Sequence, residues 1–318
     1  MSTLLLLLTI LLAGAMGYAI QRGATCTVAA VDELLTKGRA HRFLALLEAS
    51  LWVLAGLLLL RALNAMPPMP AGYSLGVWTV AGAVLLGLGA AVNRACVFGA
   101  IARFGSGDWA YLATPLGFYL GSLGAQMLVL PFLPQTIRQA APDWQPPTVL
   151  IWPLLAWLLW RVRQIWLRAH TDTATPAYTQ RLSRAVWAPH EATLVIGMTF
   201  LLLLWLAGPW TYTELLAEWS RGMTSNTASR GLLFLALLGG AVWGGQHTGR
   251  WQSQPITAAG LLRCLLGGAL MGLGSSLIPG GNDGLILTGL PLLWPYAWVA
   301  FLTMCLTIGV YLKMASWK

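Results

Sequence analysis

Long apolar stretches and short polar connectors alternate along the 318 residues of the chain. An α-helix needs about 20 apolar residues to cross the hydrocarbon core of a bilayer. The stretches lack the strict residue-by-residue alternation of membrane β-barrel strands. The pattern therefore predicts an all-α polytopic membrane protein with about nine transmembrane helices. We expect them near residues 3–20, 43–63, 73–92, 109–131, 148–160, 192–207, 231–247, 258–278 and 294–312.

Four other stretches are too short to cross a membrane and too apolar to be ordinary loops. Each follows a predicted span and begins at glycine, proline or asparagine. Irregular backbone at membrane depth is tolerated only where protein or a water-filled cavity surrounds it. These stretches therefore indicate short re-entrant or broken helices. They lie at roughly 24–35, 95–104, 209–219 and 282–290.

Several glycines and a glutamate recur at the same spacing in the two halves of the chain, which indicates an internal repeat. The matching sets are Gly87, Gly89 and Gly99 with Gly272, Gly274 and Gly284, and Gly23 and Glu33 with Gly208 and Glu218. We therefore expect a first repeat over 1–131, a second, inverted repeat over 192–318, and a connector over 132–191 with the fifth span and a basic loop. Inverted repeats with broken helices are typical of transporters, whose substrates bind near the bilayer midplane.

Lysine and arginine in short loops predict the orientation, because such residues stay on the cytoplasmic side. The fourteen loop residues named at the end of this paragraph all fall on one side if the N-terminus is outside and the C-terminus is cytoplasmic. The first span has no positive n-region and is followed at once by Arg22, so we expect a retained helix and no cleaved signal peptide. The loop residues are Arg22, Lys37, Arg39, Arg42, Arg94, Arg103, Arg161, Arg163, Arg168, Arg181, Arg184, Arg250, Lys313 and Lys318.

Composition supports the membrane assignment and narrows the function. Hydrophobic residues make up 57% of the chain and charged residues only 9%, against roughly 25% charged residues in an average soluble domain. The net charge of +9 lies in the connectors, so we expect contact with membrane lipid and no nucleic acid. The four cysteines form no CxxC pair and the four histidines stand apart from them, so we expect no metal site and no cofactor.

Two cysteines, Cys26 and Cys96, stand at the beginnings of the first two short helices. A helix N-terminus presents free N–H groups and a partial positive charge, and both attract anions. The alternative is that they are small buried apolar side chains, the usual fate of a free cysteine. That alternative is stronger for Cys264 and Cys305, which lie within ordinary spans and are weaker candidates.

In the second half, Gly281, Asn282 and Asp283 occupy the position that matches Cys96. Asp283 stands in an otherwise apolar stretch, and an acid within a membrane is a candidate functional residue by default. It is also a weak candidate for proton coupling. Its alternative role, which we favour, is to cap the fourth short helix.

Two polar residues flank the second short helix. Asn93 opens the segment that carries Cys96, and Arg103 closes the helix ahead of Gly105-Ser106-Gly107. Arg103 is as well placed to pair with Asp108 and fix that turn as to contact a substrate.

The chain resembles the YeeE/YedE sulfur-transport family of bacterial inner-membrane proteins over essentially its whole length. The motifs that carry the resemblance are Arg22-Gly23-Ala24-Thr25-Cys26, Asn93-Arg94-Ala95-Cys96-Val97-Phe98-Gly99 with Arg103-Phe104-Gly105-Ser106-Gly107, and Pro279-Gly280-Gly281-Asn282-Asp283.

This resemblance implies a thiosulfate uptake transporter, not an enzyme, in which Cys26 and Cys96 line a narrow central path. Thiosulfate would enter at 209–219 and 279–284, and a TusA-like cytoplasmic sulfur-carrier protein is an implied partner. Family members commonly use a further cysteine in the second half, where this chain has Gly281 and Asn282. The third substrate contact therefore stays open.

Other functions remain possible on the sequence alone. A close variant would carry another sulfur or selenium compound. A membrane thiol enzyme would exchange disulfides or form a persulfide on Cys96, although the first usually needs paired cysteines. A purely structural role is disfavoured, because broken helices are costly in a scaffold.

Overall fold

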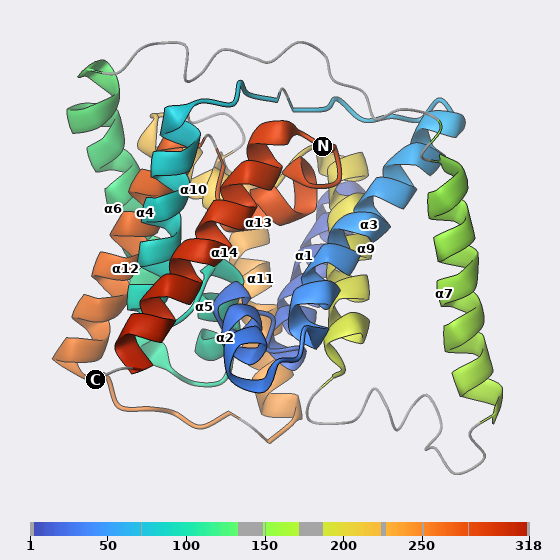
Figure 1. Ribbon diagram of the computed structural model, residues 1–318, viewed down its shortest axis with the longest axis horizontal. Coiled ribbons are helices and arrows are strands. Elements are labelled where there is room, and N and C mark those ends of the chain that lie inside the picture. Colours follow the sequence, from blue (N-terminus) through green and yellow to red (C-terminus); the bar gives the residue numbers. More distant parts are fainter. Residues whose placement is uncertain are drawn as a thin grey trace.

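The computed structural model describes residues 3–70, 72–132, 149, 151–171, 187–223, 227–249, 251–278 and 280–316. The described residues form helices joined by connectors and contain no β-sheet (Figure 1). One isolated bridge pairs Asp108 with Gln254. The prediction of an all-α protein is therefore confirmed.

Among the residues that the structure describes, eight helical segments are long and apolar enough to cross a membrane, which makes the protein a multi-pass membrane protein. Nine were predicted. The long helices within the eight segments are α1 (Thr3–Arg22), α3 (His41–Ala62), α4 (Val77–Asn93), α6 (Ala113–Gly124), α9 (Pro189–Ala207), α11 (Thr227–His247), α12 (Ala258–Leu277) and α14 (Pro295–Ser316).

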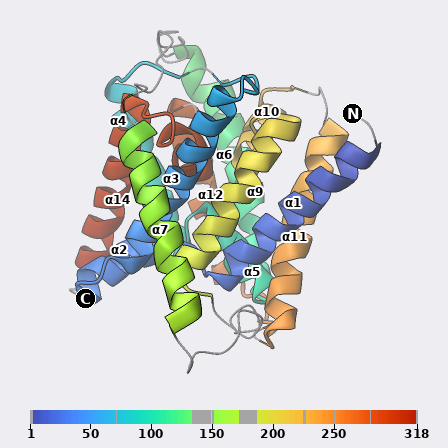
Figure 2. The ribbon, with the colours of Figure 1, turned by 90° about the vertical axis from the view of Figure 1, so that its right-hand side faces the viewer.

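The helix at the place of the predicted fifth span, α7 (Ile151–Thr171), is not one of the eight. It is long enough, but its second half carries Arg161, Arg163 and Arg168. Charged side chains within a membrane span are costly. Helix α7 stands at the right-hand edge of the molecule in Figure 1 and faces the viewer in Figure 2, and it packs on α3. A helix is therefore present where the fifth span was expected at 148–160, but it extends through the arginines expected in the following loop and is not among the apolar candidate spans.

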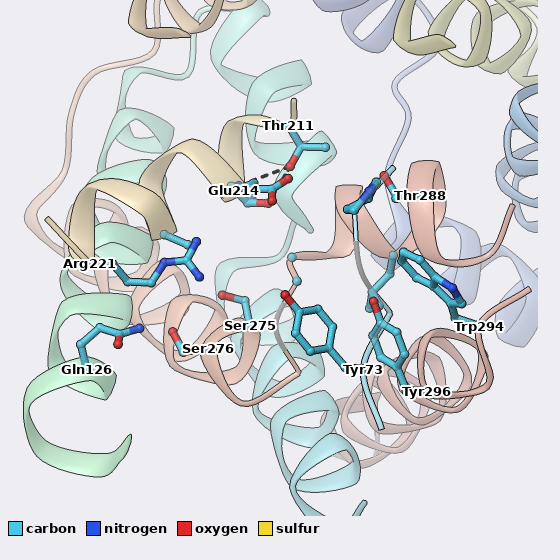
Figure 3. Close-up of a pocket in the computed structure, with 17 residues that line it drawn as sticks. Tyr73, Gln126, Thr211, Glu214, Arg221, Ser275, Ser276, Thr288, Trp294 and Tyr296 are labelled. Atoms are coloured by element: carbon cyan, nitrogen blue, oxygen red, sulfur yellow. Dashed lines mark hydrogen bonds between the residues drawn. The ribbon is translucent and has the colours of Figure 1, made fainter. Parts of the chain in front are cut away.

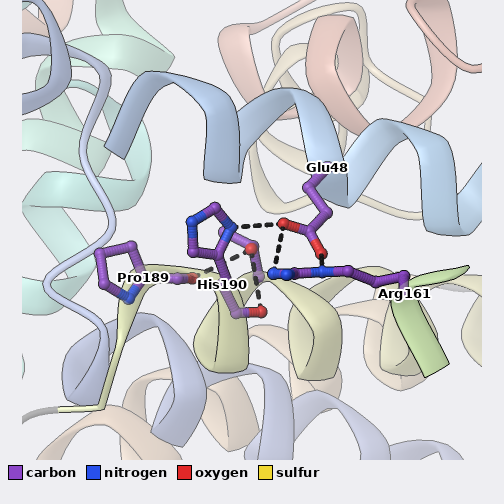
Figure 4. A network of polar contacts seen from close by, with 5 residues as sticks. Glu48, Arg161, Pro189 and His190 are labelled. Carbon is purple, nitrogen blue, oxygen red and sulfur yellow. Dashed lines mark hydrogen bonds and ion pairs between the residues drawn. The ribbon is translucent and has the colours of Figure 1, made fainter. Parts of the chain in front are cut away.

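A cluster of charged side chains ties α7 to the rest of the protein (Figure 4). Buried Glu48 of α3 accepts hydrogen bonds from Arg161 of α7, at 2.7 Å from Nε and 3.1 Å from Nη2. The same carboxylate bonds Nδ1 of His190, at the start of α9. The carboxylate is thereby compensated from two neighbouring helices, as a buried charge requires.

The four predicted short helices are all present. They are α2 (Thr27–Lys37), α5 (Val97–Gly105), α10 (Tyr212–Ser220) and α13 (Asn282–Gly284), which continues as a π-helical turn, Leu285–Gly289. Helices α10 and α13 lie toward the face where α1 begins, which we call the upper face (Figure 1). Helix α2 lies toward the opposite, lower face, where α14 ends, and α5 lies between it and the centre.

The long helices pack in pairs that resemble each other across the two halves. Helix α1 packs on α11 and α9 packs on α3, while α6 packs on α12 and α14 packs on α4. Helices α4 and α12 cross at glycines. A Cβ atom on Gly82 would lie 2.6 Å from the carbonyl oxygen of Gly274, and one on Gly89 would lie 2.6 Å from that of Gly267. Only glycine permits so close a backbone approach.

Some predicted features lie outside the described residues. They include most of the connector 132–191 and much of its basic loop, Arg181, Arg184, Arg250, Lys318 and Pro279.

Candidate functional site

The first two short helices begin after the same kind of turn. Ala24 follows the end of helix α1 and Arg94 follows the end of helix α4, both in the left-handed conformation with φ of 45° and 60°. In each case the next residue donates its N–H to a carbonyl five residues back, which is the Schellman pattern. Cys26 and Cys96 follow directly and occupy the N-cap positions of α2 and α5. Equivalent turns therefore place the two thiols.

The turn before Cys26 is anchored by a buried arginine. The guanidinium of Arg22 lies 5.3 Å from the ring centre of Tyr18 and 5.4 Å from that of Trp187. The carbonyl of Arg22 accepts a hydrogen bond of 3.0 Å from the backbone N–H of Trp187. The segment between α1 and α2 is thus held on both sides.

The two thiols lie together where α2 meets α5. The backbone N–H of Thr27, the first residue of α2, donates to Sγ of Cys96 at 3.1 Å. The thiols of Cys26 and Cys96 interact with each other, and both cysteines are free. Gly99 of α5 faces Cys26, since a Cβ atom there would lie 2.5 Å from its sulfur. Cys96 is fully buried and Cys26 is half-buried.

The second pair of short helices reaches the same point from the upper side. Fully buried Asn282, the first residue of α13, donates from Nδ2 to Oγ1 of Thr27 at 3.2 Å. The hydroxyl of Tyr212, the first residue of α10, donates to the carbonyl of Val97 at 2.9 Å. Gly281 is the N-cap of α13. The structure therefore brings together the N-termini of all four short helices, with Cys26, Cys96, Gly281 and Asn282.

Asp283 binds the neighbouring short helix. Its carboxylate accepts hydrogen bonds from Oγ1 of Thr213 and, at 3.4 Å, from the backbone N–H of Thr213. It also accepts the N–H of Gly284 at 2.9 Å. Because Gly281 holds the N-cap position, Asp283 does not cap α13 as we favoured. It joins the starts of α10 and α13.

Asn93 fixes the turn before Cys96. Its Nδ2 donates to the carbonyl of Ala95 at 2.9 Å, and its Oδ1 accepts from the hydroxyl of Thr114 at 3.1 Å. Its own carbonyl accepts the hydroxyl of Tyr111 at 3.1 Å. The side chain of Asn93 therefore holds the backbone that carries the thiol.

The remaining sequence candidates lie elsewhere. Arg103 forms no ion pair with Asp108 and instead lies 5.6 Å from the ring centre of Tyr111. Cys264 is buried in an apolar cluster with Ala95 and Phe104. Cys305 is half-buried on α14.

A cavity of about 180 Å³ opens beside the second pair of short helices (Figure 3). It is ample for several waters or a small anion. We call it the upper cavity. Thr211 and Thr213 at the start of α10, together with Gly281, form the part next to the junction of the four helices. Its other lining residues are Pro70, Tyr73, Gln126, Glu214, Ala217, Arg221, Ser275, Ser276, Gly280, Gly284, Leu285, Thr288, Trp294 and Tyr296.

Comparison with known proteins agrees with this architecture. A family model described as sulphur transport matches residues 22–312. The chain belongs to the sulphur transport family. The matched range contains all four short helices of this sulphur transport protein and both central thiols, and it confirms the resemblance to YeeE/YedE proteins. No curated protein matches the chain as a relative.

Several residues of the upper cavity were missed by reasoning from the sequence. Tyr73 comes from the connector before α4 and Tyr296 from the first turn of α14, far apart in the chain, and Ser275 and Ser276 come from the end of α12. Only the last pair had a signal, two hydroxyls at the end of an apolar span. Among the described residues, no group of three or more His, Cys, Asp or Glu side chains is arranged to hold a metal ion.

Proposed function

We propose that this sulphur transport protein takes up thiosulfate through a path that runs from the upper cavity past Cys26 and Cys96. The observation that carries the proposal is the convergence of four short-helix N-termini around two free thiols. Thr27, Val97, Tyr212 and Asn282 make direct hydrogen bonds across this junction. The N-terminus of each helix contributes a partial positive charge there.

The junction suits a divalent anion that must move on. A fixed lysine or arginine within the membrane would be costly and would hold the anion too tightly for release. Helix ends offer a weaker, shared positive potential. Thiols are weak hydrogen-bond donors, and their soft sulfur favours the terminal sulfur of thiosulfate over the oxygens of sulfate. In this proposal Asn282 and Gly281 stand where a third thiol is found in relatives.

An inverted repeat accounts for the contacts between the halves. The contact of Gly82 with Gly274 and that of Gly89 with Gly267 exchange when each residue is replaced by its counterpart in the other half. The Asn282–Thr27 and Tyr212–Val97 hydrogen bonds exchange in the same way. By the same spacing Thr211 is the counterpart of Cys26, and Gly281 of Cys96. These exchanges support two repeats, over 1–131 and 192–318.

The orientation follows from the loop charges. With the upper face outside, the upper cavity receives substrate from the periplasm of a bacterial inner membrane, and Arg94 and Arg103 lie toward the cytoplasm. A TusA-like sulfur carrier would then collect the product on the lower face. Figure 1 places the beginning of α1 and the end of α14 on opposite faces, as this orientation requires.

The test is growth on thiosulfate as the only sulfur source, in a bacterial strain without other sulfur uptake routes. The intact protein restores growth, and Cys26→Ala and Cys96→Ala do not. Cys305→Ala is the matched control and grows normally, because Cys305 lies away from the junction. The proposal is wrong if the intact protein gives no growth advantage.

Two further measurements separate the close alternatives. Competition for uptake by other sulfur and selenium anions identifies a different substrate. Mass spectrometry of Cys96 after turnover tests the sulfurtransferase alternative, in which a stable persulfide would accumulate on that thiol. If the protein is a transporter, Cys96 remains unmodified after turnover.

A further inference from the structure

A second cavity opens on the lower face, on the other side of the junction from the upper cavity. We call it the lower cavity; its volume is about 720 Å³. Three arginines line it: Arg94 after α4, Arg103 near the end of α5, and Arg263 on α12. Among the described residues that line it, Asp108 is the one acidic residue. The residues that line the lower cavity therefore carry a net positive charge.

The three guanidinium groups are not neutralised by acidic side chains. In the part of the chain that the structure describes, no ion pair joins Arg94, Arg103 or Arg263 to a carboxylate. Nε of Arg263 is buried and has no hydrogen-bond partner among the described residues. A buried guanidinium nitrogen without a partner is unfavourable, and an anion would satisfy it.

Tyr111 connects the lower cavity to the thiols. The guanidinium groups of Arg103 and Arg263 lie 5.6 Å and 5.9 Å from the centre of its ring. Its hydroxyl donates to the carbonyl of Asn93, three residues before Cys96. Arg94 itself stands two residues before Cys96. The arginines and the Cys96 turn therefore belong to one continuous piece of structure.

We propose that Arg94, Arg103 and Arg263 form a second binding site, for a small sulfur oxyanion, on the lower side of the junction. Guanidinium groups bind the oxygens of such anions with paired, charge-assisted hydrogen bonds. The site would thus recognise oxygens, whereas the junction recognises sulfur. Naming the anion as the transported one rests on the proposed function, but the existence of the site does not.

The test measures binding of radiolabelled sulfate to the purified full-length protein. Sulfate is the probe because it offers oxygens only. Because exposed charges are screened by salt, binding weakens as the ionic strength rises. The double variant R103Q/R263Q lowers the affinity by roughly tenfold or more. Arg39→Gln, which removes an exposed arginine outside the cavity, leaves sulfate binding unchanged.

Single variants keep the test decisive if the double variant does not fold. Arg94→Gln and Arg103→Gln replace exposed side chains, and each lowers sulfate affinity while the protein remains monodisperse. The proposal is overturned if sulfate affinity stays within roughly twofold of the unmodified protein in these variants, or if Arg39→Gln lowers it as much as they do. The proposal is also overturned if the arginine variants bind sulfate normally but lose thiosulfate uptake. That result would mean that the arginines dock an acidic partner protein. Failure of growth on thiosulfate would overturn the proposed function and leave this result standing.

Discussion

The backbone N–H of Thr27 donates a hydrogen bond to the sulfur of Cys96, at 3.1 Å. Thr27 begins α2 and Cys96 immediately precedes α5, so this bond joins the ends of two short helices. The sulfur is therefore held in place by backbone as well as by packing. A thiol fixed in this way can present its own hydrogen to a substrate without first becoming ordered.

Replacing that sulfur should reduce transport more than stability. We expect Cys96→Ala to lower the initial rate of thiosulfate uptake about tenfold or more, which corresponds to about 1.4 kcal/mol in the barrier. Cys96→Ser, which restores a donor but not a soft one, should recover only part of the rate. The measurement is uptake of labelled thiosulfate at equal protein abundance. Equal uptake rates for both variants and the unmodified protein would show that the Cys96 thiol does not contact the substrate during transport.

Gly99→Ala should act on Cys26 from the opposite side. The new Cβ atom would lie 2.5 Å from Sγ of Cys26, a distance that real contacts do not show, so the thiol must move. We expect uptake to fall about as far as with Cys26→Ala, roughly tenfold. Gly239→Ala is the matched control, because a Cβ atom on that helical glycine has nothing within 4 Å. Normal uptake by Gly99→Ala would show that the position of Cys26 is unimportant.

Thr213→Val should loosen the joint between α10 and α13. The change removes the hydroxyl that bonds the buried Asp283 carboxylate. A buried acceptor deprived of a partner costs about 1 to 3 kcal/mol, so the unfolding temperature in detergent should fall. In the control, Thr193→Val, the lost hydroxyl bonds only the carbonyls of its own helix, at Pro189 and His190. An equal fall in the unfolding temperature of both variants would mean that the Thr213–Asp283 bond stabilises the protein no more than a hydroxyl bond within one helix.

Arg161→Gln should release α7. The variant leaves the buried carboxylate of Glu48 with His190 alone (Figure 4). Breaking a buried ion pair by removing one partner typically costs about 3 to 5 kcal/mol. The expected readouts are a lower unfolding temperature and faster proteolysis of the α7 connections.

A surface ion pair supplies the control for α7. Arg42 lies 4.0 Å from Glu33, and the Arg42 side chain is 42% exposed. Pairs of this kind contribute about 0 to 1 kcal/mol. Arg42→Gln should therefore leave the unfolding temperature nearly unchanged, and a loss as large as that of Arg161→Gln would mean that any charge deletion has this effect.

The length and apolarity of single segments were enough to predict much of the fold. Spans and short helices are local features, set by about 20 apolar residues or by a break at glycine or asparagine. The sequence also predicted that Cys26 and Cys96 begin short helices. The arginines that set α7 apart are visible in the sequence, but the compensation of Arg161 by Glu48, far away in the chain, is not.

Contacts between distant segments could not be predicted. Asn282 bonds Thr27 across most of the chain, and Asp283 bonds Thr213. Nothing in the sequence near Asp283 indicates that its side chain bonds Thr213 at the start of α10 and not a residue of its own helix, α13. The upper cavity has the same origin, since Tyr73 and Tyr296 meet only after the halves have packed.

The glycine crossings of α4 and α12 also limit how the protein can move. Backbone lies against backbone at Gly82 with Gly274 and at Gly89 with Gly267, so the two helices have no flexible side chains between them to slide over. A seam of this kind is stiff, and rocking one half against the other would have to break it. We therefore expect the substrate to pass a nearly stationary frame, with gating confined to the short helices and the side chains at their ends.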